Sequence, residues 1–443
     1  MKIQLSDHFT YRKLLRFVLP SIVMMIFTSI YTVVDGLFVS NYVGKTAFAA
    51  INLCMPLLMG VSALGFMIGT GGSAIVARTL GEGHKEKANA GFSLLVYAMI
   101  LGGLVMSLIC FASIPSVCRA FGAEGKLLEN AVLYGRISSI SLTAFMLQNV
   151  FQSFFVTAEK PQLGLAVIVA AGVANMILDY LFIAVLGFGL IGAALATVTG
   201  EFIGGIYPLF YFARKNSSRL RLGKTSFNGK VLLQACVNGS SELMTNLSSS
   251  LVNSLFNLQL MKFSGENGVA AFGTIMYANF IFNAIYFGYS IGSAPIVSYH
   301  YGADNHAELK NMFKKSLSFV GCWGVFLFCM AQIIASPMAS VFVGYDTELC
   351  AMTSHGFRLY SRAFLFSGLN IFGSAFFTAL NNGLLSAAIS FLRTLVFQMA
   401  AVLLLPMVLG LDGIWNAVAV AEILTMFVTI TLLVRQRKRY HYL

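Results

Sequence analysis

Charged residues are scarce in this sequence. They make up 10% of the chain, whereas hydrophobic residues make up 58%. A soluble domain carries about 25% charged residues, so this chain lacks the surface charge that keeps a folded protein dissolved in water. The composition therefore excludes the soluble protein classes and indicates a membrane protein.

Signatures of common enzyme and metal sites are also missing. The seven cysteines are odd in number and include no CxxC pair, so we interpret them as small buried apolar residues rather than as metal ligands or disulfides. No HExxH pair or Walker phosphate loop occurs, and the glycine-rich stretch at residues 69–72 follows no predicted strand. We therefore predict a protein that is not an enzyme, uses no cofactor and hydrolyses no ATP.

What the chain has instead is a series of long apolar runs. A straight transmembrane helix needs about 20 apolar residues, whereas a membrane β-strand would show about 10 residues in strict alternation. The runs are too long and too uniformly apolar for strands, so the sequence predicts an all-α polytopic membrane protein with twelve transmembrane helices. The predicted helices cover residues 14–39, 47–78, 90–112, 131–157, 162–185, 190–212, 231–262, 270–299, 313–336, 353–380, 385–409 and 413–434.

Positive charge is distributed unevenly between the loops. When alternate loops are assigned to the two sides of the membrane, most of the 29 Lys and Arg residues fall on the side that holds both termini. Cytoplasmic loops attract Lys and Arg, so this asymmetry predicts cytoplasmic termini and an even number of spans. The net charge of +12 then reflects topology, and we expect no nucleic-acid partner.

The two halves of the chain resemble each other at an offset of 221 residues. At this offset Gly81 aligns with Gly302 and Glu201 with Glu422, and the second match is the more informative because carboxylates are rare inside membranes. Six spans in each half give parallel repeats, as in transporters that rock two helix bundles. We predict an N-lobe of helices 1–6, a cytoplasmic linker that behaves as a solvated loop, and a C-lobe of helices 7–12, at residues 1–213, 214–230 and 231–443.

Several acidic residues lie inside the predicted helices. Ionisable groups are costly within a membrane and are functional candidates by default. We expect no Lys or Arg clearly at mid-membrane depth, so the interior should be acidic without matching bases and should favour protons, sodium ions or organic cations. The acidic residues are Asp35, Asp179, Glu201, Glu242 and Glu422.

Asp35 and Asp179 are the strongest candidates. Tyr31 precedes Asp35 by four residues, and Asn175 precedes Asp179 by four, so each pair shares one helix face. Two carboxylates near one another can hold a proton, or a small cation with oxygen ligands. Pro20, fifteen residues before Asp35, removes a backbone donor and can kink the first helix.

Glu242 begins a second polar face, on the seventh predicted helix. Asn246 and Asn253 follow it at +4 and +11. The symmetric Glu201 and Glu422 suggest a shared architectural task, such as tying helices together, and their role stays open. We predict that the substrate cavity is lined by Glu242, Asn246, Asn253, Asn149 and Tyr31.

Together these residues resemble the multidrug and toxic compound extrusion (MATE) family, in particular its bacterial and archaeal DinF-like branch. In that branch an aspartate on helix 1 faces an Asn-x-x-x-Asp pair on helix 5 and a threonine on helix 6. The resemblance covers the whole chain and implies ion coupling, by protons or sodium, and a helix-1 bend at Pro20. Asn370 departs from the pattern because some sodium-coupled relatives carry an acid on helix 10, which weakens a C-lobe sodium site. The implied ion-coupling residues are Asp35, Asn175, Asp179 and Thr197.

The resemblance implies a secondary active multidrug efflux antiporter in the plasma membrane of a prokaryote. It would export lipophilic organic cations in exchange for protons or sodium, as a monomer surrounded by membrane lipids. Two alternatives remain: export of a natural metabolite, and flipping of lipid-linked oligosaccharides or polyprenyl diphosphates. A flippase for such anionic cargo would call for arginines in the central cavity, whereas this sequence offers acids.

Overall fold

Helices account for the regular structure of this chain. The computed structural model describes residues 3–443, and that range contains no β-strand, so the prediction of an all-α membrane fold is confirmed. Three π-helical segments and one 3-10 turn interrupt the α-helices. In chain order the elements are α1 (Tyr11–Phe38), η1 (Val39–Val43), α2 (Lys45–Gly81), α3 (Lys85–Ala120), α4 (Gly125–Thr157), α5 (Pro161–Asp179), η2 (Tyr180–Val185), α6 (Gly189–Ala213), α7 (Gly229–Gly302), α8 (His306–Val343), α9 (Thr347–Tyr360), η3 (Ser361–Ala363), α10 (Phe364–Ala379), α11 (Gly383–Phe391), η4 (Leu392–Phe397), α12 (Gln398–Leu409) and α13 (Leu411–Tyr440).

Eleven of the twelve predicted runs lie within helical structure, and the twelfth, 353–380, extends one residue beyond it. By length and composition, ten helical segments of the described residues could cross a membrane. One of them, α7, has 74 residues and holds two predicted runs, separated by a break at Gly265 with φ 61° and ψ −147°. Glycine adopts such a positive φ without a Cβ clash. A further predicted run, 353–380, follows α9, η3 and α10 in direct succession.

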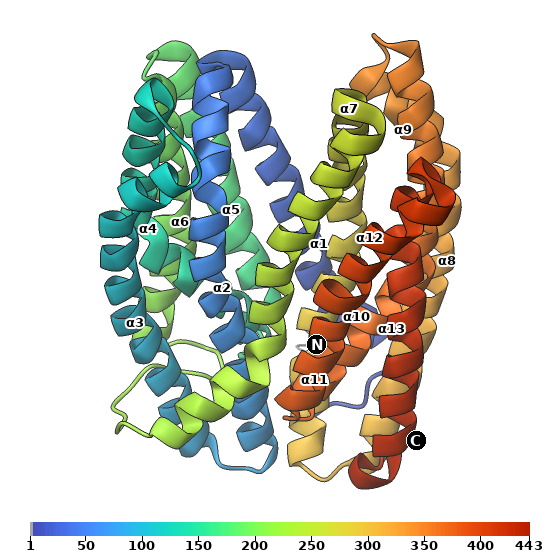
Figure 1. The fold of residues 1–443 in the computed structure, drawn as a ribbon. Helices are drawn as coiled ribbons and strands as arrows, with labels where there is room; N and C mark the ends of the chain where they lie inside the picture. The colour runs from blue at the N-terminus through green and yellow to red at the C-terminus, as the bar shows by residue number, and fades with distance from the viewer. Residues whose placement is uncertain (1–2) are drawn as a thin grey trace.

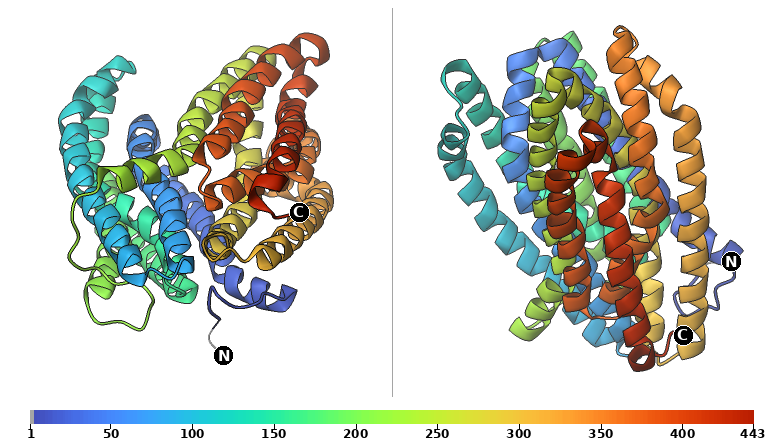
Figure 2. Two further views of the ribbon diagram at one scale, coloured as in Figure 1. Left: turned by 90° about the horizontal axis from the view of Figure 1, so that it is seen from below. Right: turned by 45° about the vertical axis from the view of Figure 1, so that its right-hand side comes forward.

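The helices form two groups. Figure 1 shows α2–α6 gathered on one side and α8–α13 on the other, and the view from below in Figure 2 separates the same groups. The first part of α7 rises from beneath the first group towards the second, and α1 lies between them (Figure 1). We refer to α1–α6 and α7–α13 as the two halves.

The halves pack through glycines whose positions follow the 221-residue offset. A Cβ on Gly71 of α2 would overlap the backbone of Gly239 in α7. At the offset positions, a Cβ on Gly292 of α7 would lie 2.9 Å from the Cβ of Val18 in α1. Small residues let membrane helices bring their backbones together, so glycine sets the spacing at both contacts.

A second glycine pair repeats the same relation. A Cβ on Gly81 would overlap the carbonyl oxygen of Tyr299, and a Cβ on Gly302 would overlap that of Arg78. Gly81 and Gly302 are related by the offset, and so are Arg78 and Tyr299. Residues that match between the repeats therefore make matching contacts across the interface, as a two-fold relation between the halves requires.

The N-terminal segment connects the two halves. The backbone N–H of Leu5 donates to Oε1 of Glu159, which follows α4, at 2.7 Å. The backbone N–H of Phe9 donates to Oε1 of Glu308 in α8 at 2.9 Å, and the side chains of Leu5 and Phe9 are buried. Residues 5–9 thus bridge the first half and the second.

The linker between α6 and α7 differs from the solvated loop that the sequence suggested. Leu220 and Leu222 are buried, and the backbone N–H of Arg221 donates to Oδ1 of Asn89 in α3 at 2.9 Å. Two leucines and a backbone hydrogen bond hold this segment against the first half, because its basic residues alternate with apolar ones that find a surface to cover.

We expect Gly239→Ala to destabilise the protein. Its Cβ would overlap the carbonyl oxygen of Met67 in α2, which can yield only if the two helices separate. Overpacking costs about 1–3 kcal/mol, so the apparent melting temperature in detergent should fall by a few degrees. Gly102→Ala in α3 is the matched control, because nothing lies within 4 Å of that site. Equal melting temperatures for the two variants would contradict the close packing of α2 on α7.

Candidate functional site

The predicted ion-coupling residues surround a small cavity in the first half. Its volume is about 90 Å³, and Asp35, Asn175 and Thr197 line it together with Tyr31 and Glu201. Asp35 and Asn175 precede the two π-helical segments, η1 after α1 and η2 after α5, by four and five residues. Such local changes of helix type frequently occur at functional sites.

Asp179 completes this group. It is fully buried, and its carboxyl group lies close enough to that of Asp35 to interact electrostatically. No donor among the described residues reaches Oδ1 of Asp35, either oxygen of Asp179 or Oδ1 of Asn175. These oxygens can therefore take up a proton, or a small cation that prefers oxygen ligands.

Other polar side chains also line this cavity. They are Glu201 of α6, Tyr31 of α1 and Gln148 of α4. Thr197 donates to the carbonyl oxygen of Ala193 one turn earlier, at 3.1 Å, which leaves its oxygen lone pairs available as acceptors.

A larger cavity lies between the two halves. Its volume is about 300 Å³, and its lining comes from α1, α2 and α4 on one side and from α7, α10, α11 and η4 on the other. Glu242 and Asn246 line it as predicted. Phe66, Phe280 and Phe287 contribute aromatic rings, and several serines and threonines contribute hydroxyl groups.

Three other predicted residues lie outside this larger cavity. Tyr31 lines the small cavity instead. Asn149 is buried and donates to the carbonyl oxygen of Ser62 at 3.5 Å, so it ties α4 to α2. Asn253 is half-buried on α7 and is not among the lining residues. Helix α1 continues through Pro20 as a single helix, so this structure shows the unbroken form of the predicted kink site.

Arg393 contradicts the expectation that the acidic interior has no matching base. It was counted among the loop residues when positive charge was divided between the two sides, although it lies eight residues inside the predicted run 385–409, about 12 Å at 1.5 Å per residue. Its side chain is 13% exposed and lines the larger cavity. The depth within the run was the signal that could have identified it.

Arg393 is paired with Glu422 of α13. Its Nε and Nη2 atoms lie 2.8 Å and 2.7 Å from Oε1 of Glu422. Oε2 of Glu422 accepts from Nδ2 of Asn370 at 2.7 Å, and Oδ1 of Asn370 accepts from Thr429 at 3.0 Å. Asn370 occupies the helix-10 position where some sodium-coupled relatives carry an acid. Here it is part of a buried network that joins α10, η4 and α13.

The equivalent glutamates of the two halves consequently have different surroundings. Glu201 has no ion-pair partner among the described residues and lies on a cavity with Asp35, whereas Glu422 has an arginine. The position that the 221-residue offset matches to Arg393 is Gly172, where a Cβ would crowd Phe27 and Tyr31. The first half therefore keeps unpaired acids where the second half has an ion pair.

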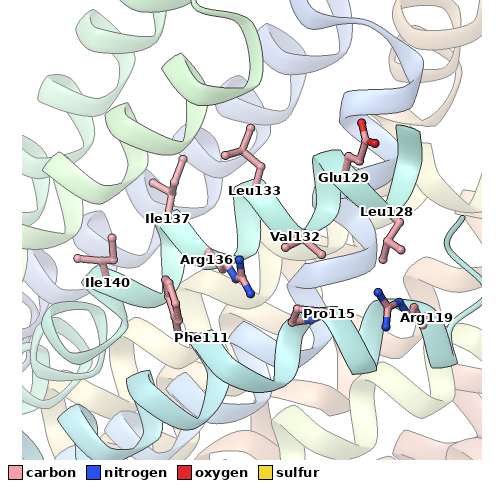
Figure 3. Close-up of a pocket in the computed structure, with 10 residues that line it drawn as sticks. All are labelled: Phe111, Pro115, Arg119, Leu128, Glu129, Val132, Leu133, Arg136, Ile137 and Ile140. Atoms are coloured by element: carbon pink, nitrogen blue, oxygen red, sulfur yellow. The ribbon is translucent and has the colours of Figure 1, made fainter. Parts of the chain in front are cut away.

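A third hollow is separate from these sites. It lies between α3 and α4 and is lined mostly by apolar side chains, as Figure 3 shows. The Arg136 guanidinium lies 5.2 Å from the centre of the Phe111 ring, and Leu133 and Ile140 are exposed. This hollow contains none of the predicted site residues, and its apolar lining suits contact with lipid.

Comparison with known proteins gives consistent matches over most of the chain. The family model described as MatE matches residues 20–181 and 243–404. The chain is 21% identical to the multidrug export protein MepA of Staphylococcus haemolyticus, over 97% of this chain and 94% of that protein. It is 20% identical to MepA of Staphylococcus saprophyticus, over 93% of this chain and 91% of that protein.

Solved structures resemble the fold closely. A MATE structure in the straight conformation matches with a TM-score of 0.92 and 22% identity, over 98% of this chain and 97% of that one. An outward-facing multidrug resistance MATE family transporter matches with a TM-score of 0.88 and 22% identity, again over 98% and 97% of the two chains.

Glu422→Gln should destabilise the protein strongly. It leaves the buried Arg393 guanidinium without a counter-ion, and removal of one partner of a buried pair costs about 3–5 kcal/mol. Arg393→Gln combined with Glu422→Gln should recover most of this loss, because no charge is then left unpaired. Thermal unfolding can be followed with a thiol-reactive dye that reports exposure of the buried cysteines Cys54, Cys110 and Cys118. A double variant no more stable than the single one would contradict the pairing.

Proposed function

Because this chain belongs to the MatE family of multidrug efflux transporters, we propose that it is a secondary active antiporter that exports lipophilic organic cations. The chain is a multi-pass membrane protein and a transporter, not an enzyme. Protons or sodium ions would drive the exchange, and no further cofactor would be needed. The relatives named multidrug export proteins support small molecules as the cargo.

The observation that carries the proposal is the proximity of the Asp35 and Asp179 carboxyl groups. Oδ1 of Asp35 and both oxygens of Asp179 have no hydrogen-bond donor among the described residues, and Asp35 lines the small cavity. A proton or sodium ion that enters this group would neutralise it, with Asn175 and Thr197 as further oxygen ligands. Loss of repulsion would let α1 repack, and Pro20 is the position in α1 where a bend costs least, because its nitrogen donates no hydrogen bond.

The cavity between the halves suits the proposed cargo. Its volume of about 300 Å³ matches a flat drug-sized molecule, and aromatic rings attract both apolar surfaces and cations. Glu242 has no ion-pair partner among the described residues, so a cation can bind to it. Glu242 and Glu422 outweigh Arg393, which favours cations over the diphosphates that a flippase would carry.

Orientation and surroundings are part of the same proposal. The side rich in Lys and Arg, which holds the termini, the basic linker and the loop between α2 and α3, would face the cytoplasm. The membrane would be the plasma membrane of a prokaryote, and the protein would act as a monomer among lipids. Export of a natural metabolite would use the same cavity and the same ion-coupling group, so drug export and metabolite export differ only in cargo.

Asp35→Asn should abolish coupled transport. In proteoliposomes, an imposed proton or sodium gradient should move a cationic dye such as ethidium, and the ion whose gradient works identifies the coupling ion. The amide cannot accept a proton, so the gradient-driven rate should fall by about tenfold or more. Asp412→Asn is the matched control, because Asp412 is half-exposed and pairs with His355 at 2.8 Å outside both cavities.

Two results would count against this proposal. If neither gradient moves any cationic dye in the wild type, coupled export of cations fails. If Asp35→Asn transports as well as Asp412→Asn, the coupling group lies elsewhere.

A further inference from the structure

We propose that Arg393 binds an anionic group of the cargo, so that the larger cavity accepts zwitterionic molecules as well as plain cations. The cationic part would lie against Glu242 and a carboxylate would lie against Arg393. The inference rests on the proposed function only in treating the molecule that enters this cavity as cargo.

Some N–H groups of the Arg393 guanidinium have no hydrogen-bond partner among the described residues. A guanidinium carries five N–H groups in a fixed fork, and here Nε and Nη2 both reach a single oxygen, Oε1 of Glu422. The two N–H groups of Nη1 have no partner among the residues that the structure describes. Because the side chain lines the cavity, a carboxylate that enters can accept these hydrogen bonds.

The network behind Arg393 holds this fork in place. Glu422 is fixed from its other oxygen by Asn370, and Asn370 is fixed by Thr429. Glu422 and Asn370 are almost fully buried, so the guanidinium is held from the protein side rather than by water. A preoriented arginine loses little freedom when it binds a carboxylate, and planar two-point recognition of carboxylates is the property that distinguishes arginine from lysine.

Glu242 supplies the opposite charge on the same cavity. It lines the cavity together with Arg393, and the two side chains are close enough to interact electrostatically. No hydrogen bond or ion pair engages the Glu242 carboxylate from the rest of the described chain. A plain cation can pair only with Glu242. A zwitterion can pair with Glu242 and also accept hydrogen bonds from the free N–H groups of Arg393.

The two cavities near the predicted site residues differ in this combination of charges. The small cavity in the first half is lined by Asp35 and Glu201 and includes no Lys or Arg. At the position equivalent to Arg393, Gly172 packs so closely on Phe27 and Tyr31 that a long side chain has no room. Only the larger of the two cavities therefore offers both an acid and a base.

Two dyes that differ by one ester test the inference. Rhodamine 110 carries a delocalised cation and a free carboxylate, and rhodamine 123 is its methyl ester, which keeps the cation and loses the anion. Their dissociation constants for the purified full-length protein in detergent can be measured by fluorescence anisotropy at neutral pH. We expect the combined Arg393→Gln and Glu422→Gln variant to weaken rhodamine 110 binding by about tenfold or more and to leave rhodamine 123 binding within about twofold of wild type.

Further variants guard against trivial outcomes. Arg393→Lys keeps the counter-ion of Glu422 and should fold even if the double variant does not. It should weaken rhodamine 110 binding selectively, because lysine lacks the fork. Glu242→Gln should weaken the binding of both dyes. Arg136→Gln is the matched control, because Arg136 lies over Phe111 outside the cavity, and it should change neither dissociation constant.

The outcomes separate this inference from the proposed function. If wild type fails to bind rhodamine 110, or if both arginine variants bind the two dyes as wild type does, the inference is overturned. If Arg393→Lys weakens the binding of both dyes equally, the inference is overturned as well. If wild type binds both dyes with the expected selectivity but no gradient moves either one, antiport fails while the assignment of Arg393 stands.

Discussion

A charge that is buried in a membrane needs a partner, and this requirement shapes both halves of the molecule. In the first half, Asp35 and Asp179 lie near each other without a basic partner among the described residues, and we propose that a proton or a small cation balances their charge. In the second half, Glu422 has Arg393 as its counter-ion. One duplicated architecture therefore contains a pair of acids without a protein counter-ion and an acid that has one. Such a division suits an exchange in which one site takes up an ion and another holds cargo.

Glycine spacing explains how these sites come to lie on either side of one interface. The contacts of Gly71 and Gly239 on one side, and of Gly292 and Val18 on the other, join the halves backbone to backbone at two related places. Side chains of ordinary size are present between these contacts, and the space they leave is the larger cavity. The halves approach closely at the glycine contacts and less closely elsewhere, so a cavity remains between them, and residues of both halves line it.

Much of the architecture could be predicted from the sequence because hydrophobic length determines where a chain can cross a membrane. The family resemblance also grouped Asp35, Asn175 and Thr197, and the structure brings these three residues together around one cavity. Periodicity was less informative for Asn253, because it identifies residues that share a face but not which neighbour that face meets. Arg393 was missed for another reason: charge counting assigns basic residues to loops, and only the three-dimensional structure reveals a buried glutamate from α13 as its partner.

The docked linker has a practical consequence for how the chain could be assembled. The bond from Arg221 to Asn89 lies within the first half, and Leu220 and Leu222 pack in a hydrophobic cluster that is mostly from the first half but includes Ala235 of α7. Asn228 caps the start of α7 and so belongs to the second half. Between them, Phe227 is 81% exposed. A chain divided after Phe227 would keep the hydrogen bond and the helix cap each within one piece, so the two halves are suited to expression as separate polypeptides that reassociate through their glycine contacts and this cluster.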